Sequence, residues 1–151
     1  MKFFIIVLIM CFSVVAQFSV KALERKSGAK MEYKSNQELI KDLNKRAKLE
    51  IWPDIKLQRN LQITPINGYL LITTHGRTIG AAVPKYWEFI VTDESGEILR
   101  ETGQSRIPSY SRDNWYSLNL IRLPDDLSFP ITVYVVSRIL GQRSVFVISE
   151  D

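Results

Sequence analysis

Residues 86–102, YWEFIVTDESGEILRET, carry the clearest structural signal in this sequence. Trp87, Phe89 and Val91 occupy alternate positions, which is the period-two pattern of a half-buried strand. Residues 93–96 then supply turn chemistry, because an Asp can bond its own backbone and a Gly accepts a positive φ. Residues 98–102 return as a second strand. The stretch therefore predicts a β-hairpin inside an all-β domain.

Further strands are predicted on both sides of this hairpin. They cover residues 55–64, 69–74, 115–121, 131–136 and 145–148. Turn signals stand between them, at Asn67-Gly68, at residues 75–80 and at Gly141-Gln142. The segment 131–136 is apolar on both faces, which is typical of a central strand. Short strands with a turn about every eight to twelve residues favour an immunoglobulin-like antiparallel β-sandwich of about seven strands.

One amphipathic helix is predicted ahead of the sandwich, over residues 35–50. Ser35 and Glu38 have the spacing of a capping box, and Leu39, Leu43 and Ala47 follow at helical spacing. Lysines and an arginine fill the other faces, so a membrane-surface helix is an alternative to a helix packed on the edge or end of the sheet. We expect the packed helix, because the apolar face is narrow and acidic residues dilute the charge.

The N-terminus resembles a secretory signal, with Lys2, an apolar run over residues 3–15 and small residues beyond it. Two cleavage sites are plausible, after Ala16 and after Ala22, and we favour the second. Alternatives are an uncleaved membrane anchor and a lipoprotein signal at Cys11. The expected division is a signal peptide over 1–22, a flexible lead-in over 23–34, the helix over 35–50 and the sandwich over 51–151. The expected location is the periplasm or the exterior, or an anchored form on the membrane.

Composition narrows the function classes. The formal net charge is only +4, two of the lysines lie in the expected signal, and the basic residues of the β region are dispersed. Such a surplus argues against nucleic-acid binding. The single cysteine is Cys11, so the exported chain would have neither a disulfide nor a thiolate metal ligand. No Asn-x-Ser/Thr acceptor is present either, and together these absences favour a bacterial envelope protein.

The C-terminal half resembles bacterial immunoglobulin-like modules of the flagellar hook-capping type. The resemblance covers residues 87–148 and is carried by Asp93-x-x-Gly96, Trp115, Leu123-Pro124, Tyr134 and Gly141. The chain departs from such modules after Trp115, where residues 116–120 continue as a strand instead of forming an Asp/Gly-rich turn. The resemblance implies a β-sandwich and transfers no functional residue.

The longest irregular segment, residues 103–113, is the predicted contact surface. Polar loops with exposed tyrosine and arginine are common binding sites. Core packing explains Trp87 and Trp115 most simply; if one of them is exposed, we expect it to be Trp115, since Tyr116, Leu118 and Leu120 occupy the opposite face of its strand. The candidate binding residues are Trp115, Tyr110, Arg112 and Arg106.

The expected function is a non-enzymatic, exported module that binds a protein or envelope component, by edge-strand pairing or through the 103–113 loop. No catalytic residue, cofactor or metal is expected, and membrane contact is expected only if the N-terminal segment stays uncleaved. One alternative is a small-ligand or carbohydrate-binding domain that uses Trp115 or the sandwich interior. A hydrolase built on His75, the only histidine, is a further alternative, although a turn residue explains His75 more simply.

Overall fold

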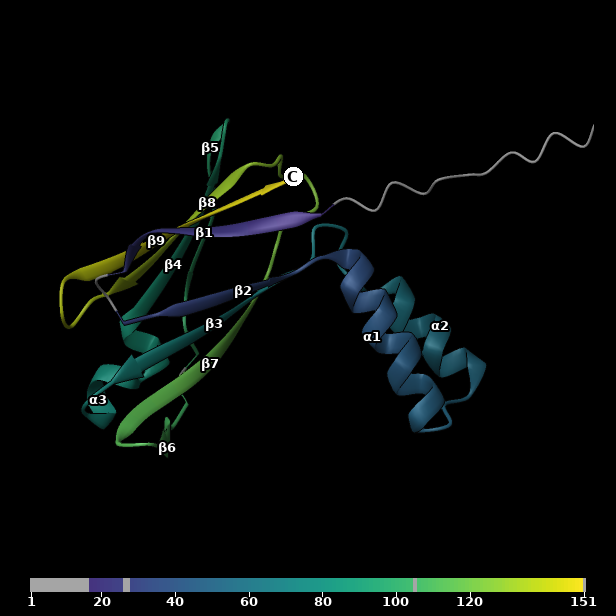
Figure 1. The fold of residues 1–151 in the computed structure, drawn as a ribbon, viewed down its shortest axis with the longest axis horizontal. Coiled ribbons are helices and arrows are strands. Elements are labelled where there is room, and N and C mark those ends of the chain that lie inside the picture. Colours follow the sequence, from purple (N-terminus) through teal and green to yellow (C-terminus); the bar gives the residue numbers. More distant parts are fainter. Residues whose placement is uncertain (1–16, 26–27, 105, 151) are drawn as a thin grey trace, which may run out of the picture.

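The structure is a computed structural model that describes residues 17–25, 28–104 and 106–150. Nine strands in this part of the chain form two antiparallel sheets, which confirms the predicted mainly-β fold and exceeds the predicted seven strands. The sheets stack as a sandwich, and a pair of helices projects from one end of it (Figure 1).

The first sheet has five strands in the order β1-β9-β8-β4-β5. Their bounds are β1 Phe18–Arg25, β9 Gln142–Glu150, β8 Ile131–Ser137, β4 Trp87–Asp93 and β5 Gly96–Thr102. The hairpin predicted from residues 86–102 is confirmed as β4 and β5, and Gly96 takes the expected positive φ of 117°. The predicted central strand is β8, which lies between β9 and β4.

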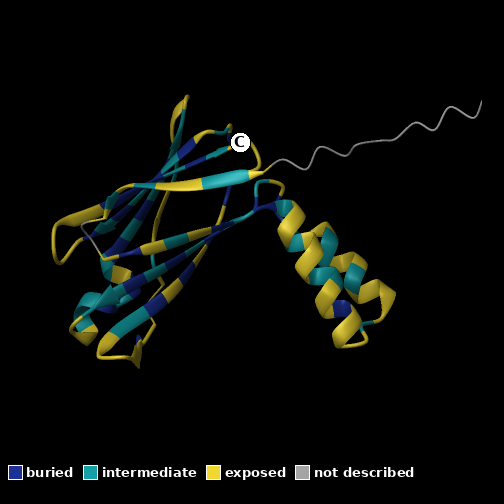
Figure 2. Cartoon of the chain, viewed as in Figure 1, coloured by how far each residue is buried: buried dark blue, intermediate teal, exposed yellow. Residues whose placement is uncertain are grey.

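The second sheet has four strands in the order β2-β3-β7-β6. Their bounds are β2 Lys30–Lys34, β3 Tyr69–Gly76, β7 Asn114–Arg122 and β6 Ser109–Ser111. The core lies between the sheets, where buried residues alternate along the facing strands (Figure 2). Trp87, Phe89 and Val91 are fully buried there, as the period-two pattern predicts. Burying aromatic and branched side chains in this way is the main driving force for the fold.

Two helices, α1 Asn36–Leu49 and α2 Asp54–Gln62, form a helical hairpin between the adjacent strands β2 and β3. The helix predicted over residues 35–50 is confirmed as α1, and both hydrogen bonds of the Ser35–Glu38 capping box are present. The prediction that it packs on the sheet is wrong, since α1 packs on α2 and the pair extends away from the sandwich (Figure 1).

The strand predicted over residues 55–64 is wrong, because this segment is helix α2. Leu57 and Leu61 are one helical turn apart and are partly buried, whereas Ile55 and Ile63 are exposed, so the alternation did not mark a buried strand face. The sandwich domain is therefore not continuous over 51–151. Its described residues are 18–25, 28–34, 69–104 and 106–150, with the helical hairpin inserted between residues 34 and 69.

The flexible lead-in predicted over residues 23–34 is also wrong, because this segment contains the end of β1 and all of β2. β1 pairs with β9, over a hundred residues away, and no local pattern reports such a partner. Residues 1–16 of the expected signal lie outside the described part of the chain. Residues 18–22, which the expected signal also includes, belong to β1.

The link from β3 to β4 crosses from one sheet to the other. Residues 75–80 were predicted as a hairpin turn, but His75 and Gly76 end β3 and the chain continues into the short helix α3 Ile79–Ala82. The 3-10 helix η1 Pro84–Tyr86 then leads into β4. The Trp87 indole N–H donates to the Ala81 carbonyl at 2.9 Å, which ties this crossing to the core.

Candidate functional site

Strand β7 has the opposite orientation to the one its sequence suggests. Ser117, Asn119 and Ile121 are buried, whereas Leu118 and Leu120 are 52% and 62% exposed. The prediction that Tyr116, Leu118 and Leu120 face inward is therefore wrong. The buried polar side chain of Asn119 is satisfied by donating to the Ile72 carbonyl at 3.3 Å. The Ser117 hydroxyl is also buried and has no hydrogen-bond partner among the described residues, and the leucines lie on the outer face of the sheet.

One edge of β7 lies open over residues 118–122. β6 pairs with β7 only at residues 114–116, and the other neighbour, β3, covers the opposite edge. The Leu123 N–H donates to the Gly68 carbonyl at 3.1 Å, so the backbone groups of Leu123 face β3. Successive residues of a strand direct their N–H and C=O groups to opposite edges. Asn119 and Ile121 therefore direct their backbone groups toward β3. Leu118, Leu120 and Arg122 direct theirs toward the open edge, where no described strand pairs with them.

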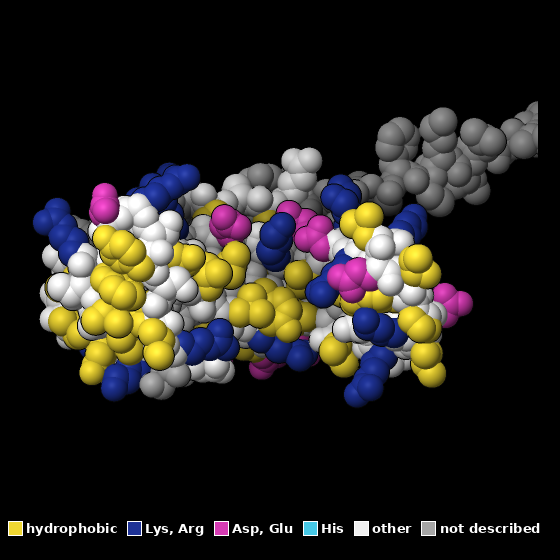
Figure 3. Space-filling model, turned by 90° about the horizontal axis from the view of Figure 1, so that it is seen from below, with side chains coloured by type: hydrophobic (Ala, Val, Ile, Leu, Met, Phe, Trp, Pro, Cys, Tyr) yellow, Lys and Arg dark blue, Asp and Glu magenta, His cyan; other side chains and the backbone are white. Residues whose placement is uncertain are grey.

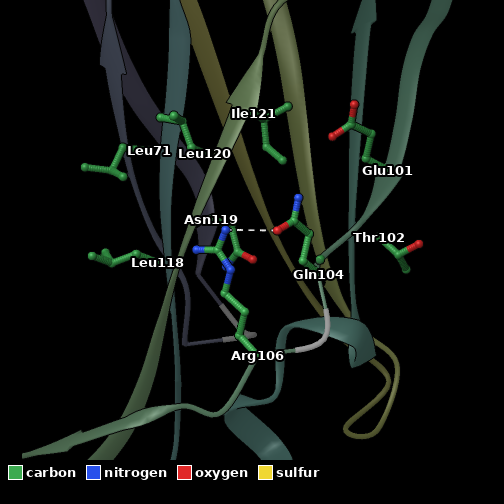
Figure 4. Close-up of a pocket in the computed structure, with 10 residues that line it drawn as sticks. Leu71, Glu101, Thr102, Gln104, Arg106, Leu118, Asn119, Leu120 and Ile121 are labelled. Atoms are coloured by element: carbon green, nitrogen blue, oxygen red, sulfur yellow. Dashed lines mark hydrogen bonds between the residues drawn. The ribbon is translucent and has the colours of Figure 1, made fainter.

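A cavity of about 180 Å³ lies along this open edge. Its lining residues come from β7, from β3, from the end of β5 and from the loop that follows β5. Leu71, Leu118 and Leu120 lie on one side of the strand, and Glu101, Thr102 and Gln104 lie on the other (Figure 4). β5 is itself the edge strand of the first sheet, so the cavity lies where the edges of both sheets meet.

The polar wall of the cavity comes from Arg106 and Gln104. The Arg106 guanidinium donates to the Gln104 side-chain oxygen at 2.9 Å, the contact drawn as a dashed line in Figure 4. Across the strand, Leu120 is the register partner of Leu71, so two leucines stand side by side on the apolar wall. The cavity thus combines backbone donors and acceptors, an apolar wall and one cation.

The four predicted binding residues are only partly brought together. Tyr110 and Trp115 are register partners, and their rings contact each other with centroids 5.1 Å apart. Trp115 is half-buried rather than exposed, while Tyr110 is 59% exposed. Arg112 lies at the β6–β7 turn, with a φ of 49°. Arg106 lines the cavity at the β7 edge and is separate from the groove that Arg112 lines.

That second groove lies on the outer face of the β2-β3-β7-β6 sheet and has a volume of about 690 Å³. Lys30, His75 and Arg112 line it, together with the hydroxyl groups of Thr73, Ser111 and Tyr116. Burial, reinforced by the charge of Lys30, lowers the pKa of His75. The described lining includes no carboxylate that could orient the imidazole as a catalytic base.

Sequence reasoning identified Arg106 and the loop that follows β5, but it missed the leucines and the open edge. One signal for the orientation of β7 was available at its end and in the residue just after it. Ile121 and Leu123 share the parity of Asn119, and both are buried. Within the described residues, no three His, Cys, Asp or Glu side chains are arranged to hold a metal ion. None of the described helices has the length and apolar character needed to span a membrane.

A comparison with known proteins finds no matching family model, no matching curated protein and no matching solved structure.

Proposed function

We propose that this protein is an exported, non-enzymatic β-sandwich that binds an extended segment of a cell-envelope protein along the open edge of β7. The observation that carries the proposal is the edge over residues 118–122, which pairs with no strand among the described residues and is flanked by exposed leucines. A segment added there would take up the backbone groups of Leu118 and Leu120, as in β-strand addition. The side chains of both partners would then contribute specificity.

The cavity supports an extended peptide better than a compact ligand. It follows the strand from Leu118 to Ile121 and holds only about 180 Å³, less than the roughly 300 Å³ at which drug-sized ligand pockets begin. Natural sheets protect exposed edges with charges, prolines or bulges, because unprotected edges pair with other chains. Here two of the three residues directed to the open edge, Leu118 and Leu120, are apolar, and only Arg122 carries a charge, so the edge favours pairing.

Export is supported by the apolar run over residues 3–15. Of the two cleavage sites, the one after Ala16 leaves β1 intact, because β1 begins at Phe18. Cleavage after Ala22 would remove the residues that pair with the last part of β9. We therefore assign the mature N-terminus to Gln17.

Photo-crosslinking tests the proposed function. A benzoylphenylalanine is placed at Leu118 in one chain and, as a control, at Glu94 in another, because Glu94 lies in the exposed β4–β5 turn. Both proteins are produced in a bacterial host with its envelope intact. We expect one envelope protein to crosslink from position 118 and not from position 94. Leu120→Lys, made in the position-118 chain, should abolish that product by placing a charge on the apolar wall.

Equal crosslinking from both positions, or a chain that remains free of any product, would contradict the proposal. A crosslinked dimer from position 118 alone would mean that two copies of the chain pair along their β7 edges.

A small-ligand function is the second candidate, and the 690 Å³ groove favours it. Its cations and hydroxyl groups suit an acidic sugar or another small polar anion. Trp115 contributes to the tryptophan fluorescence of the protein. A ligand bound at Arg112 would change the surroundings of the Tyr110–Trp115 pair and so the emission of Trp115. Titration with acidic envelope sugars should then shift tryptophan emission, and Arg112→Gln should remove the shift. An unchanged spectrum would eliminate this candidate.

A further inference from the structure

The free end of the helical hairpin carries an unusual group of exposed apolar residues. Leu49, Ile51 and Ile55 are 75%, 88% and 81% exposed. They lie at the end of α1, in the connecting turn and in the first turn of α2, as far from the sandwich as the hairpin reaches (Figure 1). We call residues 49–55 the hairpin tip. Isolated exposed apolar residues are common, but three of them within the seven residues of one projecting end point to a contact surface.

The backbone of the tip adds a second observation. Ile51 has a φ of 51°, in the left-handed region. A helix commonly ends with a glycine in this conformation, and a β-branched residue there is strained. Such strain persists at positions where the side chain serves a function. Glycine would fit this backbone better, but it would remove the most exposed apolar side chain of the tip.

Basic residues surround the tip. Lys45 and Lys48 are exposed on α1, and the Lys56 ammonium lies 3.9 Å from the centre of the Trp52 ring. The acidic Glu50 is engaged, since it accepts hydrogen bonds from Arg46 at 2.7 Å and from the Trp52 indole at 2.6 Å. Asp54 is the remaining acidic residue of the tip. Hydrophobic and basic side chains, with acidic ones among them, share the surface of the hairpin (Figure 3).

The position of the hairpin relative to the N-terminal strand is also informative. The Phe18 ring, at the start of β1, contacts Tyr33 with ring centroids 5.1 Å apart. Tyr33 lies two residues before the Ser35 cap of α1. β1 therefore begins at the same end of the sandwich from which the hairpin projects (Figure 1).

We propose that the hairpin tip inserts into the interfacial region of an anionic phospholipid membrane. Leu49, Ile51 and Ile55 would enter the boundary between headgroups and acyl chains, with Trp52 at headgroup level, as aromatic residues at membrane surfaces prefer. Lys45, Lys48 and Lys56 would contact the anionic headgroups. Contact would not depend on an uncleaved N-terminal segment, contrary to the expectation from the sequence.

The shape of the tip favours a membrane over other partners. The apolar residues lie on a narrow projecting end and not along a helix face or in a groove. Two copies could meet only end to end, and such a contact would bury far less than the roughly 1,200 Å² of a stable protein interface. A fluid bilayer can accept a convex apolar tip, and its surface charge complements the surrounding lysines.

The test uses the chain beginning at Gln17, the assigned mature N-terminus, which lacks Cys11, so that an introduced cysteine is the only site for an environment-sensitive fluorophore. The label is placed at Ile55→Cys in one chain and at Glu94→Cys, in the β4–β5 turn, in a control. Both chains keep the same N-terminal residues, so any difference between them reports the hairpin. We expect the label at position 55 to shift to shorter wavelength with phosphatidylglycerol-containing vesicles and to remain unchanged with pure phosphatidylcholine. The label at position 94 should not respond to either.

A matched pair of substitutions isolates the tip. Ile51→Gly removes the exposed side chain and relieves the strained φ, so its thermal stability should be unchanged or higher. It should weaken the response of the position-55 label about tenfold in lipid concentration, the loss expected from one apolar side chain. Ile63→Ser, which removes an isoleucine that is 62% exposed outside the tip, should leave the response within about twofold.

Three results would overturn the proposal. The label at position 55 could stay unshifted on anionic vesicles, or it could shift equally on neutral ones. The third is a concentration-dependent dimer that Ile51→Gly dissociates, with no response to vesicles, which would assign the tip to a second copy of the chain.

Discussion

His75 lies in a site that resists protonation. Its Nε2 atom is buried and has no hydrogen-bond partner among the described residues, so a second ring proton there would find no acceptor. Lys30 and Arg112 line the same groove and add positive charge. Burial and the Lys30 charge both lower the pKa of His75 below its usual value of 6.5. Each effect favours the neutral imidazole in the folded protein.

This environment predicts a loss of stability at mildly acidic pH. Below about pH 6.5 the unfolded chain binds a proton at His75 that the folded protein resists, so the free energy of unfolding falls as the pH decreases. We expect His75→Gln to show a smaller fall between about pH 7.5 and pH 5.5. Urea unfolding of both proteins at the two pH values measures the difference. Glu88 and Asp93 also have lowered pKa values, but they titrate below this window.

An equal fall in the two proteins would show that His75 is protonated as easily in the folded state as in the unfolded one.

Single residues also show the limit of pattern analysis. The alternation of leucines in β7 correctly predicts a strand but not which face is buried. Either choice leaves one set of side chains inside, and the inner set here includes the polar Ser117 and Asn119, of which Asn119 donates to a carbonyl of β3. Those contacts depend on residues nearly fifty positions away. The cluster of leucines at the candidate site was therefore not predictable from β7 alone.

At the scale of elements, the most instructive error is α2. Residues 55–63 fit a strand pattern with one exception, Arg59, and they also fit a helix through Leu57 and Leu61. Helix formation needs a packing partner for so short a segment. α1 supplies this partner, and Ala47 is the buried residue of the two helices. A pattern of nine residues could not decide between these alternatives.

The open edge of β7 gives the prediction at this scale. Proline lacks an N–H group, so it destabilises a strand most where that N–H pairs with a neighbour. We expect the cost of proline relative to alanine to be at least about 1 kcal/mol larger at Ile121, whose N–H is directed to β3, than at Leu120. Urea unfolding of Leu120→Ala, Leu120→Pro, Ile121→Ala and Ile121→Pro gives both differences, and the alanine variants cancel the loss of each side chain.

If proline costs the same at both positions, the Leu120 N–H is already paired, and the edge would not be available to a partner strand.

For the whole molecule, the sequence indicated a β-sandwich but not where the sandwich begins or where it is interrupted. The hairpin of β4 and β5 and the central strand β8 were predictable because their apolar pattern is strong and their partners are close in sequence. β1 and β2 were missed because each is an edge strand with many exposed polar residues, and β1 pairs only with the distant β9. The inserted helical hairpin separates β2 from β3 in the sequence, although these strands are neighbours in the sheet, so no local pattern indicated their pairing.

The N-terminal strand predicts where the mature protein begins. Phe18 packs on Phe129 with ring centroids 4.9 Å apart, and residues 18–22 pair with β9. A signal peptidase that cut after Ala22 would remove these contacts, so we expect the intact mass of the exported protein to correspond to a chain beginning at Gln17. Mass spectrometry of the periplasmic or secreted protein measures this directly. A chain beginning at Leu23 would show that the first sheet is stable without most of β1.

The pairing of β1 with β9 also determines how the sandwich responds to force. Phe18 is the register partner of Glu150, so the outer ends of the first and last strands lie side by side. Pulling these two ends apart loads the hydrogen bonds of the pair one after another, like a zipper, and not all together in shear. The sandwich should therefore open at low tension from this corner, whereas a load applied between the β7 edge and the hairpin would bypass β1 and β9.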